Sequence, residues 1–148
     1  MIYRMSAALL SLIGLFISGY LYLYKIGRIG TLACGTGACE TVQLSRWSRF
    51  AGMDVSLIGI LGYAALLGLS LLALQPRISS RRWPATWLTV LAGIGVGFTL
   101  YLTCLELFVI HAVCRWCLGS GVVILAIFVL AVLDRRQPAD GPLPVGRP

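Results

Sequence analysis

The sequence predicts an all-α integral membrane protein, built as a four-helix bundle. Of its 148 residues, 59% are hydrophobic and only 11% are charged, and the mean hydropathy is +0.91. A soluble domain of this size could not bury so much apolar surface, whereas a bilayer accommodates it. A membrane span needs about 20 apolar residues. Four such stretches are visible, at residues 5–24, 55–74, 86–109 and 114–133.

The first stretch, residues 5–24, is predicted to stay in the membrane as a span. Arg4 and the apolar residues after it resemble the start of a signal peptide, but no small-residue cleavage site follows. Instead the stretch ends in Tyr22, Tyr24 and Lys25, which are side chains suited to a membrane interface.

A short amphipathic helix is predicted over residues 40–52, between the first two spans. Leu44, Trp47 and Ala51 recur there at steps of three and four residues, and polar side chains fill most positions between them. This pattern is typical of a helix that lies on the membrane surface. Such a helix is either a simple interfacial connector or a lid over the outer end of the bundle.

The distribution of positive charge predicts the orientation. The net charge of +7 is interpreted as topology rather than as a sign of nucleic-acid binding. The arginines before the first span, between the second and third, and directly after the fourth include Arg4, Arg77, Arg81, Arg82, Arg135 and Arg136. The positive-inside rule then places both termini in the cytoplasm. We expect one four-span domain over residues 1–134 and a disordered cytoplasmic tail, rich in Pro and Gly, over residues 135–148.

Four of the five cysteines form two close pairs that share one side of the membrane. Cys34 and Cys39 follow the first span, and Cys114 and Cys117 follow the third. An odd number of crossings precedes each pair, so both pairs lie in the same compartment, which the charge pattern makes the extracytoplasmic one. Two dithiols that can meet beside lipid suggest a relay of electron pairs between proteins and a lipid-soluble carrier.

The second pair has the spacing Cys-x-x-Cys at the start of a helix. The partial positive charge of a helix N-terminus favours the thiolate, which is the reactive species in disulfide exchange. Two intervening residues allow Cys114 and Cys117 to close a bond within the first turn. The first pair encloses Gly35 and Gly37, which predict a mobile and exposed backbone that a soluble partner can reach.

Other interpretations of the cysteines remain open. The four thiols could form a structural zinc site, or two inert disulfides of an assembly subunit. They could also hand on a soft ion such as Cu(I) in a small membrane transporter. Cys104, within the third span, is expected to be an inert buried thiol.

In these features the chain resembles the vitamin K epoxide reductase family, specifically its prokaryotic disulfide-bond-forming members without a fused thioredoxin domain. The resemblance covers residues 5–133. It rests on the two cysteine pairs, on Leu105-Glu106-Leu107 and on the pattern Val42-x-x-Ser45-x-x-Ser48-x-Phe50-x-Gly52-x-x-x-Ser56-x-x-Gly59-x-x-x-Tyr63. The other four-helix oxidase of this type, the DsbB family, has its two cysteine pairs in the opposite order.

The resemblance implies a quinone-dependent thiol-disulfide oxidoreductase of the prokaryotic inner membrane that supports disulfide bond formation. Cys117 would attack the quinone, ubiquinone or menaquinone, with Cys114 as its active partner. Cys39 would exchange with Cys114, and Cys34 with a separate thioredoxin-fold (DsbA-like) protein. Ser56 matches the family's serine near the quinone. The resting protein would hold either a Cys34–Cys39 or a Cys39–Cys114 bond.

The resemblance does not extend to vitamin K epoxide reduction. The mammalian enzymes carry an Asn just before the serine and a Tyr one turn after the second active cysteine. This chain has Val55 and Gly121 at those positions.

Three further residues are candidates for the quinone site. Glu106 lies within a span, where a carboxyl group is costly; it either serves the protons that a quinone takes up or is solvated by the headgroups. His111 is either a proton relay or an interfacial histidine. Trp116 either anchors the chain at the interface or lines the quinone pocket.

Overall fold

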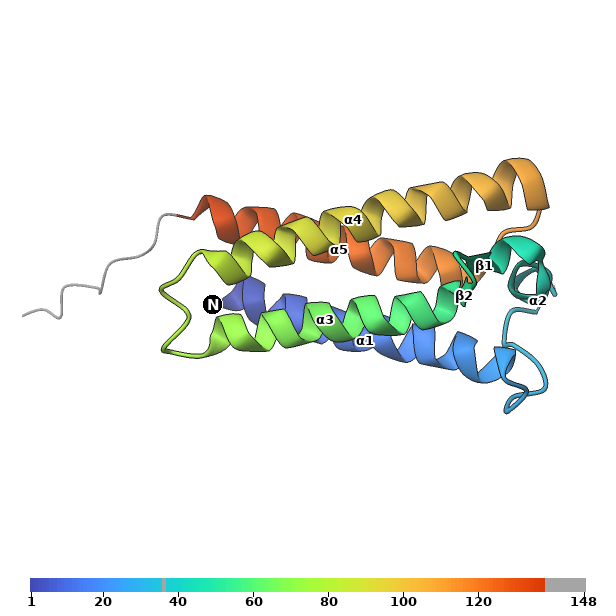
Figure 1. Cartoon of the computed structure of the whole chain (residues 1–148), viewed down its shortest axis with the longest axis horizontal. Coiled ribbons are helices and arrows are strands. Elements are labelled where there is room, and N and C mark those ends of the chain that lie inside the picture. The colour runs from blue at the N-terminus through green and yellow to red at the C-terminus, as the bar shows by residue number, and fades with distance from the viewer. Residues whose placement is uncertain (36, 138–148) are drawn as a thin grey trace, which may run out of the picture.

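Four long helices run side by side along the molecule (Figure 1). The structure is a computed structural model that describes residues 1–35 and 37–137. The long helices are α1 (Ile2–Lys25), α3 (Val55–Leu74), α4 (Trp83–Leu105) and α5 (Arg115–Arg136). All four are long and apolar enough to cross a membrane, which confirms the predicted all-α bundle of four spans. The predicted disordered tail lies largely outside the described residues.

In this bundle, as in membrane proteins generally, large apolar side chains lie on the outer surface and small residues lie in the interior. Large apolar side chains point outward; Phe16, Ile94 and Val122 are each more than 60% exposed. The interior instead holds small residues such as Ser11 and Ala92, which are fully buried. Small residues let helices approach closely where lipid removes the hydrophobic drive for association. The exposed apolar surface is therefore the surface that lipid would cover.

Helix α1 packs most closely against α3, because glycines stand where the two helices meet. A Cβ atom on Gly14 would lie 2.2 Å from the ring of Tyr63, and one on Gly59 would lie 2.7 Å from the hydroxyl of Ser18. Tyr63 in turn belongs to a buried core that includes Leu66, Leu88 and Ile127. No larger residue fits at these two positions without moving a neighbour, so the α1–α3 contact depends on both glycines.

One arginine joins the helices at the end of the bundle that holds the N-terminus. The Nε of Arg4 donates to Asp134 of α5 at 3.0 Å, and these side chains are only 19% and 7% exposed. Its Nη1 also donates to the carbonyl oxygens of Ala73, at 2.8 Å, and Ser79, at 3.2 Å. A single guanidinium thus connects α1 and α5 with the end of α3 and the loop that follows it.

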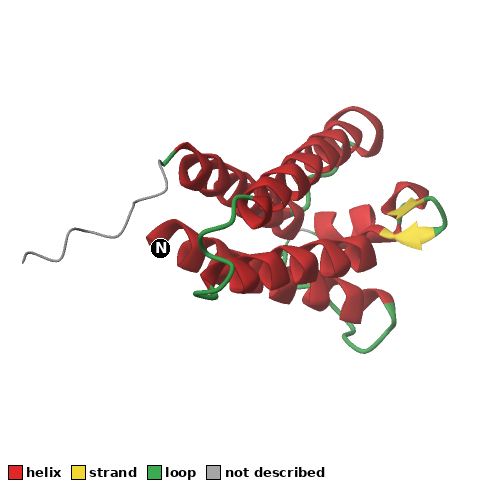
Figure 2. Cartoon of the chain, turned by 60° about the vertical axis from the view of Figure 1, so that its left-hand side comes forward, coloured by secondary structure: helices red, strands yellow, loops and turns green. Residues whose placement is uncertain are grey.

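A compact cap covers the opposite end of the bundle. It consists of helix α2 (Ala38–Leu44), the 3₁₀ helix η1 (Arg46–Ser48) and a hairpin of β1 (Arg49–Phe50) and β2 (Met53–Asp54). Figure 2 shows the two strands in yellow at this end. The predicted helix over residues 40–52 is therefore wrong in extent. Ala51 (φ 52°) and Gly52 (φ 82°) adopt left-handed conformations that form the hairpin turn and cannot continue a helix.

The link between α4 and α5 is also less regular than the sequence predicts. Helix α4 continues into a π-helical turn, η2 (Glu106–Ile110), which ends at His111 in a left-handed conformation (φ 56°). An extended segment then leads to Cys114. Such π-helical turns often occur at functional sites. The expectation that Cys104 is buried is wrong, because its side chain lies on an exposed face of α4.

Replacing Arg4 with Met should destabilise the bundle. Asp134 would keep a largely buried charge without its partner, which costs about 3 kcal/mol for such a pair. We expect a lower midpoint of thermal unfolding in detergent. Arg136→Met, at an exposed position of the same end, should leave the midpoint unchanged. An equal effect of the two substitutions would contradict a specific role for Arg4.

Candidate active site

The first cysteine pair is closed as a disulfide inside the cap. Cys34 and Cys39 are bonded, with their Cα atoms 6.1 Å apart, and they are 2% and 0% exposed. The prediction of an exposed pair is therefore wrong. Leu32 and Val42 flank the disulfide and pack with it into one apolar cluster, which outweighs the flexibility of the glycines between the two cysteines.

Two hydrogen bonds hold the loop that carries Cys34. The backbone N–H of Leu32 donates to the Glu40 carboxylate at 3.1 Å, and the N–H of Ala33 donates to the Tyr20 hydroxyl at 3.0 Å. The loop is thereby fixed both to the start of α2 and to the end of α1. These bonds explain how a segment with several glycines still buries both of its sulfur atoms.

The second pair lies at the start of α5, and both of its thiols are free. Cys114 is the N-cap residue, and its sulfur accepts a hydrogen bond from the backbone N–H of Cys117 at 3.4 Å. A hydrogen bond with the Cys117 side chain, helped by backbone N–H groups, holds the pKa of Cys114 below that of an ordinary thiol, although burial opposes this. Cys114 therefore has the environment of a reactive thiolate.

Both cysteine pairs belong to the same buried cluster. Cys34, Cys39 and Cys114 are buried together in it, and Cys117 packs against it. The cluster forms because α2, which carries Cys39, contacts the start of α5. Figure 1 shows α2 and the start of α5 at one end of the bundle. The geometry thus brings together the two pairs that lie 75 residues apart in the sequence, from Cys39 to Cys114.

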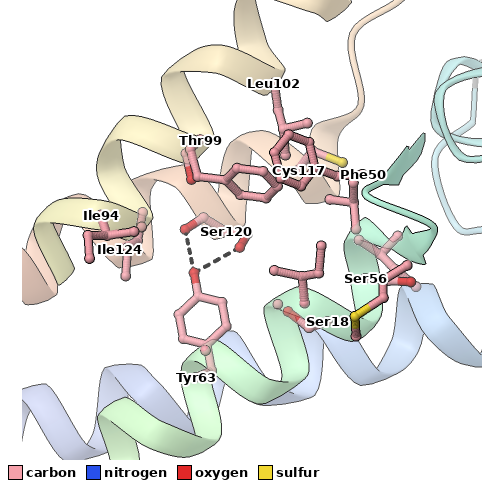
Figure 3. Close-up of a pocket in the computed structure, with 18 of the residues that line it drawn as sticks. Ser18, Phe50, Ser56, Tyr63, Ile94, Thr99, Leu102, Cys117, Ser120 and Ile124 are labelled. Carbon is pink, nitrogen blue, oxygen red and sulfur yellow. Dashed lines mark hydrogen bonds between the residues drawn. The ribbon is translucent and has the colours of Figure 1, made fainter. Parts of the chain in front are cut away.

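A cavity of about 480 Å³ opens beside the second pair (Figure 3). It extends from the hairpin toward the middle of the bundle between α3, α4 and α5. Cys117 is the one member of the two pairs that lines it. Most of the wall is apolar. In it, the ring of Phe50 from the hairpin packs edge-on against the ring of Phe98 of α4, with ring centroids 5.4 Å apart. The site therefore places a free thiol, Cys117, beside a largely apolar chamber.

The family model that matches this chain is that of the vitamin K epoxide reductase family, and it matches residues 5–132. The chain belongs to the vitamin K epoxide reductase family. Membership makes it a multi-pass membrane thiol-disulfide oxidoreductase. The family is in general linked to quinones and to thioredoxin-fold partners.

In a member of the vitamin K epoxide reductase family, the few polar groups of the cavity are the ones that could bind a ligand by hydrogen bonds. The Ser56 hydroxyl is buried and has no hydrogen-bond partner among the described residues. The Tyr63 hydroxyl donates to the carbonyl oxygen of Ser120 at 2.8 Å, as Figure 3 shows, so its hydrogen is already used. Ser56 is thus a hydroxyl donor in this cavity that a ligand oxygen could engage.

Glu106 joins the cavity to the second cysteine pair. Its side chain is 4% exposed and lines the cavity, and its Oε2 accepts the backbone N–H of Cys114 at 3.1 Å. The Cys117 thiol lines the same cavity, so the carboxyl group and the thiol border one space. The π-helical turn η2 starts at Glu106 and directs the carboxyl group toward the head of α5.

Gln43 is a member of the site that the sequence did not suggest. It is buried, and its Nε2 donates to the Cys117 sulfur at 3.7 Å. The signal that could have identified it is its position four residues after Cys39, one turn further along the helix α2 that carries the first pair. A buried amide at that position has to find a polar partner.

Trp116 and His111 do not line the cavity. The Trp116 ring packs against Tyr20 of α1, with ring centroids 5.0 Å apart. His111 is exposed at the end of η2. Their suggested roles toward a quinone stay predictions, and the positions of both residues favour packing and the interface instead.

Among the described residues, the cysteines are not arranged as the four-thiolate zinc site that the spacing left open. A disulfide joins Cys34 to Cys39, so only Cys114 and Cys117 remain as thiols in the cluster. Metal sites of this type need deprotonated thiolates. In this state only two of the four sulfur atoms are available as metal ligands.

The low pKa of Cys114 predicts a titration that can be measured. Thiolate absorbance in the ultraviolet should appear at a lower pH than for an ordinary thiol, because the thiolate accepts hydrogen bonds from Cys117. In Cys117→Ala, the side-chain donor is lost and the titration should move to higher pH. Both proteins would carry Cys104→Ser to remove the exposed thiol. A titration that does not move would contradict the role of the hydrogen bond.

Proposed function

We propose that the protein oxidises the dithiol of a separate thioredoxin-fold protein and passes the electron pair to a membrane quinone, thereby supporting disulfide bond formation. The observation that carries this proposal is the position of Cys117. It is the single cysteine of the two pairs that lines the cavity, while its partner Cys114 lies in one cluster with Cys39. One end of the relay thus contacts the cap, and the other end contacts an apolar chamber.

Each step of the relay is an exchange of sulfur atoms. The partner's dithiol attacks the Cys34–Cys39 disulfide at Cys34, and the partner leaves oxidised. The freed Cys39 thiolate attacks Cys114 in a Cys114–Cys117 disulfide, and Cys34 then re-forms its bond with Cys39. This leaves Cys114 and Cys117 as the dithiol, which is the arrangement that the structure has. Electrons and protons balance, because each exchange moves one electron pair.

The cavity fits a quinone head with part of its apolar tail. Its volume of about 480 Å³ is within the range of small-molecule sites, and its wall is mainly apolar with a few polar groups. Ser56 would donate to a quinone oxygen, since its hydroxyl has no partner among the described residues. A bound quinone would supply an acceptor for two electrons and two protons. A quinone dissolved in the membrane would also reach this cavity directly from the lipid.

The charge pattern supports an orientation with both termini in the cytoplasm of a cell whose inner membrane would hold the protein. The Arg4 end of the bundle also carries Arg135 and Arg136, and the loop after α3 adds further arginines. With this end in the cytoplasm, the cap and both cysteine pairs face the extracytoplasmic side. A thioredoxin-fold partner would meet them there, and exported proteins would be the final source of the electrons.

Anaerobic mixing with a reduced thioredoxin-fold donor and a soluble quinone should produce quinol. Cys117→Ala should abolish it, because Cys117 is the cysteine that lines the cavity. Cys104→Ser, which changes a thiol outside both pairs, should keep the wild-type rate. If the wild-type protein forms quinol no faster than the uncatalysed mixture, the proposed function is wrong.

Replacing Ser56 with Ala should weaken quinone binding without affecting thiol exchange. Loss of one hydrogen bond of about 1 kcal/mol raises the KM for the quinone by about fivefold. Ser70→Ala is the matched control, because Ser70 is also buried in α3 without a partner among the described residues but does not line the cavity. An equal rise in KM for both variants would argue against Ser56 as a quinone ligand.

A further inference from the structure

Glu106 is placed where a proton must move if the proposed function is correct. It is the one carboxyl group in the described lining of the 480 Å³ cavity. Conversion of a dithiol to a disulfide releases two protons, and reduction of a quinone takes up two. A group that contacts the thiol and also faces the quinone chamber can carry one of them directly. Glu106 meets both conditions.

Glu106 has two neighbours at the head of α5, one that orients its side chain and one that could give it a proton. One carboxyl oxygen, Oε2, accepts the backbone N–H of Cys114 at 3.1 Å, which orients the side chain. The Cys117 thiol, the sulfur that lines the cavity, borders the same space as the carboxyl group. A carboxylate that accepts one backbone N–H keeps lone pairs for a proton. Glu106 is therefore placed to take up the proton of the neighbouring Cys117 thiol.

Gln43 faces the same sulfur from the cap. Its Nε2 donates to the Cys117 sulfur at 3.7 Å, and Glu106 lines the same small cavity as both of them. As the thiol proton leaves toward Glu106, the amide stabilises the thiolate that remains. Since Gln43 shares α2 with Cys39, this stabilisation is available when the cap is docked on α5.

A second, small cavity adjoins the same three side chains. It has a volume of about 30 Å³, and Gln43, Glu106 and Cys117 are among its lining residues. That volume is enough for a water molecule, and the polar groups of the wall provide it with partners. Glu106 thus borders the quinone chamber on one side and a water-sized space under the cap on the other.

No cation competes for the Glu106 carboxylate. Within residues 1–35 and 37–137, no Lys, Arg or His forms an ion pair or hydrogen bond with it. The titratable groups that contact it are Cys114 and Cys117, both at the head of α5, and Tyr63 lines the same cavity. Without a cationic partner, no ion pair holds this buried carboxyl group in its charged form, so it is free to take up and release a proton.

We propose that Glu106 is a catalytic residue that accepts the proton of Cys117 and delivers it to a quinone oxygen. The Cys117 thiolate gives up the electron pair as the Cys114–Cys117 disulfide forms, and the quinone becomes quinol. Glu106 supplies one of the two protons and returns to the carboxylate. The proton of Cys114 is released to water, and the quinol takes its second proton from water, so that protons and electrons balance.

The test measures the two half-reactions separately in the full-length protein. In Glu106→Gln, the amide oxygen still accepts the Cys114 N–H, but the side chain cannot carry a proton. Oxidation of a reduced thioredoxin-fold donor in the absence of quinone should stay within a fewfold of wild type. A single turnover of quinone reduction by the pre-reduced protein should slow by about 10²- to 10⁴-fold. Glu106→Asp, which keeps a carboxyl group, should recover part of the rate.

The pH dependence provides a second readout. An acceptor must be deprotonated before it can take a proton, so the wild-type quinone half-reaction should slow as pH falls through the Glu106 titration. Glu106→Gln should lack this dependence. The infrared difference between the dithiol and disulfide forms, without quinone, should contain a carboxyl band that is lost in Glu106→Gln, because oxidation removes the thiol proton beside the carboxyl group.

The outcomes distinguish this proposal from the proposed function. If Glu106→Gln reduces quinone at the wild-type rate, or slows both half-reactions equally, then Glu106 is not the proton carrier. Infrared difference spectra that are identical in wild type and Glu106→Gln would also overturn it. If wild-type protein fails to reduce quinone at all, the proposed function fails irrespective of Glu106.

Discussion

The packing of α2 against the start of α5 is the contact on which the site depends. In the proposed relay, one sulfur has to reach another directly, so two cysteine pairs that are remote in sequence must share one small volume. The apolar cluster that holds Cys39 and Cys114 meets this requirement. It also excludes water from both sulfurs. The cap therefore works as a structural part of the redox site and not only as a loop between two spans.

Charged groups fix the two ends of the bundle in different ways. At one end, Arg4 joins Asp134 to the chain that links α3 and α4. At the other end, Lys25 of α1 pairs with Asp54 at 3.1 Å and also donates to the Ser48 hydroxyl. This second pair ties the hairpin to the end of the first span. The hairpin is thereby held over the cavity, where Phe50 forms part of the wall.

The helices could be predicted from sequence, while the cap and the cavity could not. The spans follow from the length and hydropathy of each apolar run, and these are local properties. The hairpin could not be predicted because Ala51 adopts a positive φ, which is uncommon for residues other than glycine. The buried state of Cys34 was missed because Gly35 indicates flexibility, whereas packing of the flanking apolar side chains decides the outcome. Gln43 was missed because its partner, Cys117, is 74 residues away.

Both cysteine pairs, Glu106 and the small cavity under the cap lie at one end of the bundle, while Tyr63 and Ser120 are hydrogen-bonded across the chamber further in. In the proposed reaction, thiols lose protons and the quinol gains them at that same end. No net charge then travels from one leaflet to the other. Turnover would be electroneutral, so the voltage across the bilayer would neither drive nor resist it.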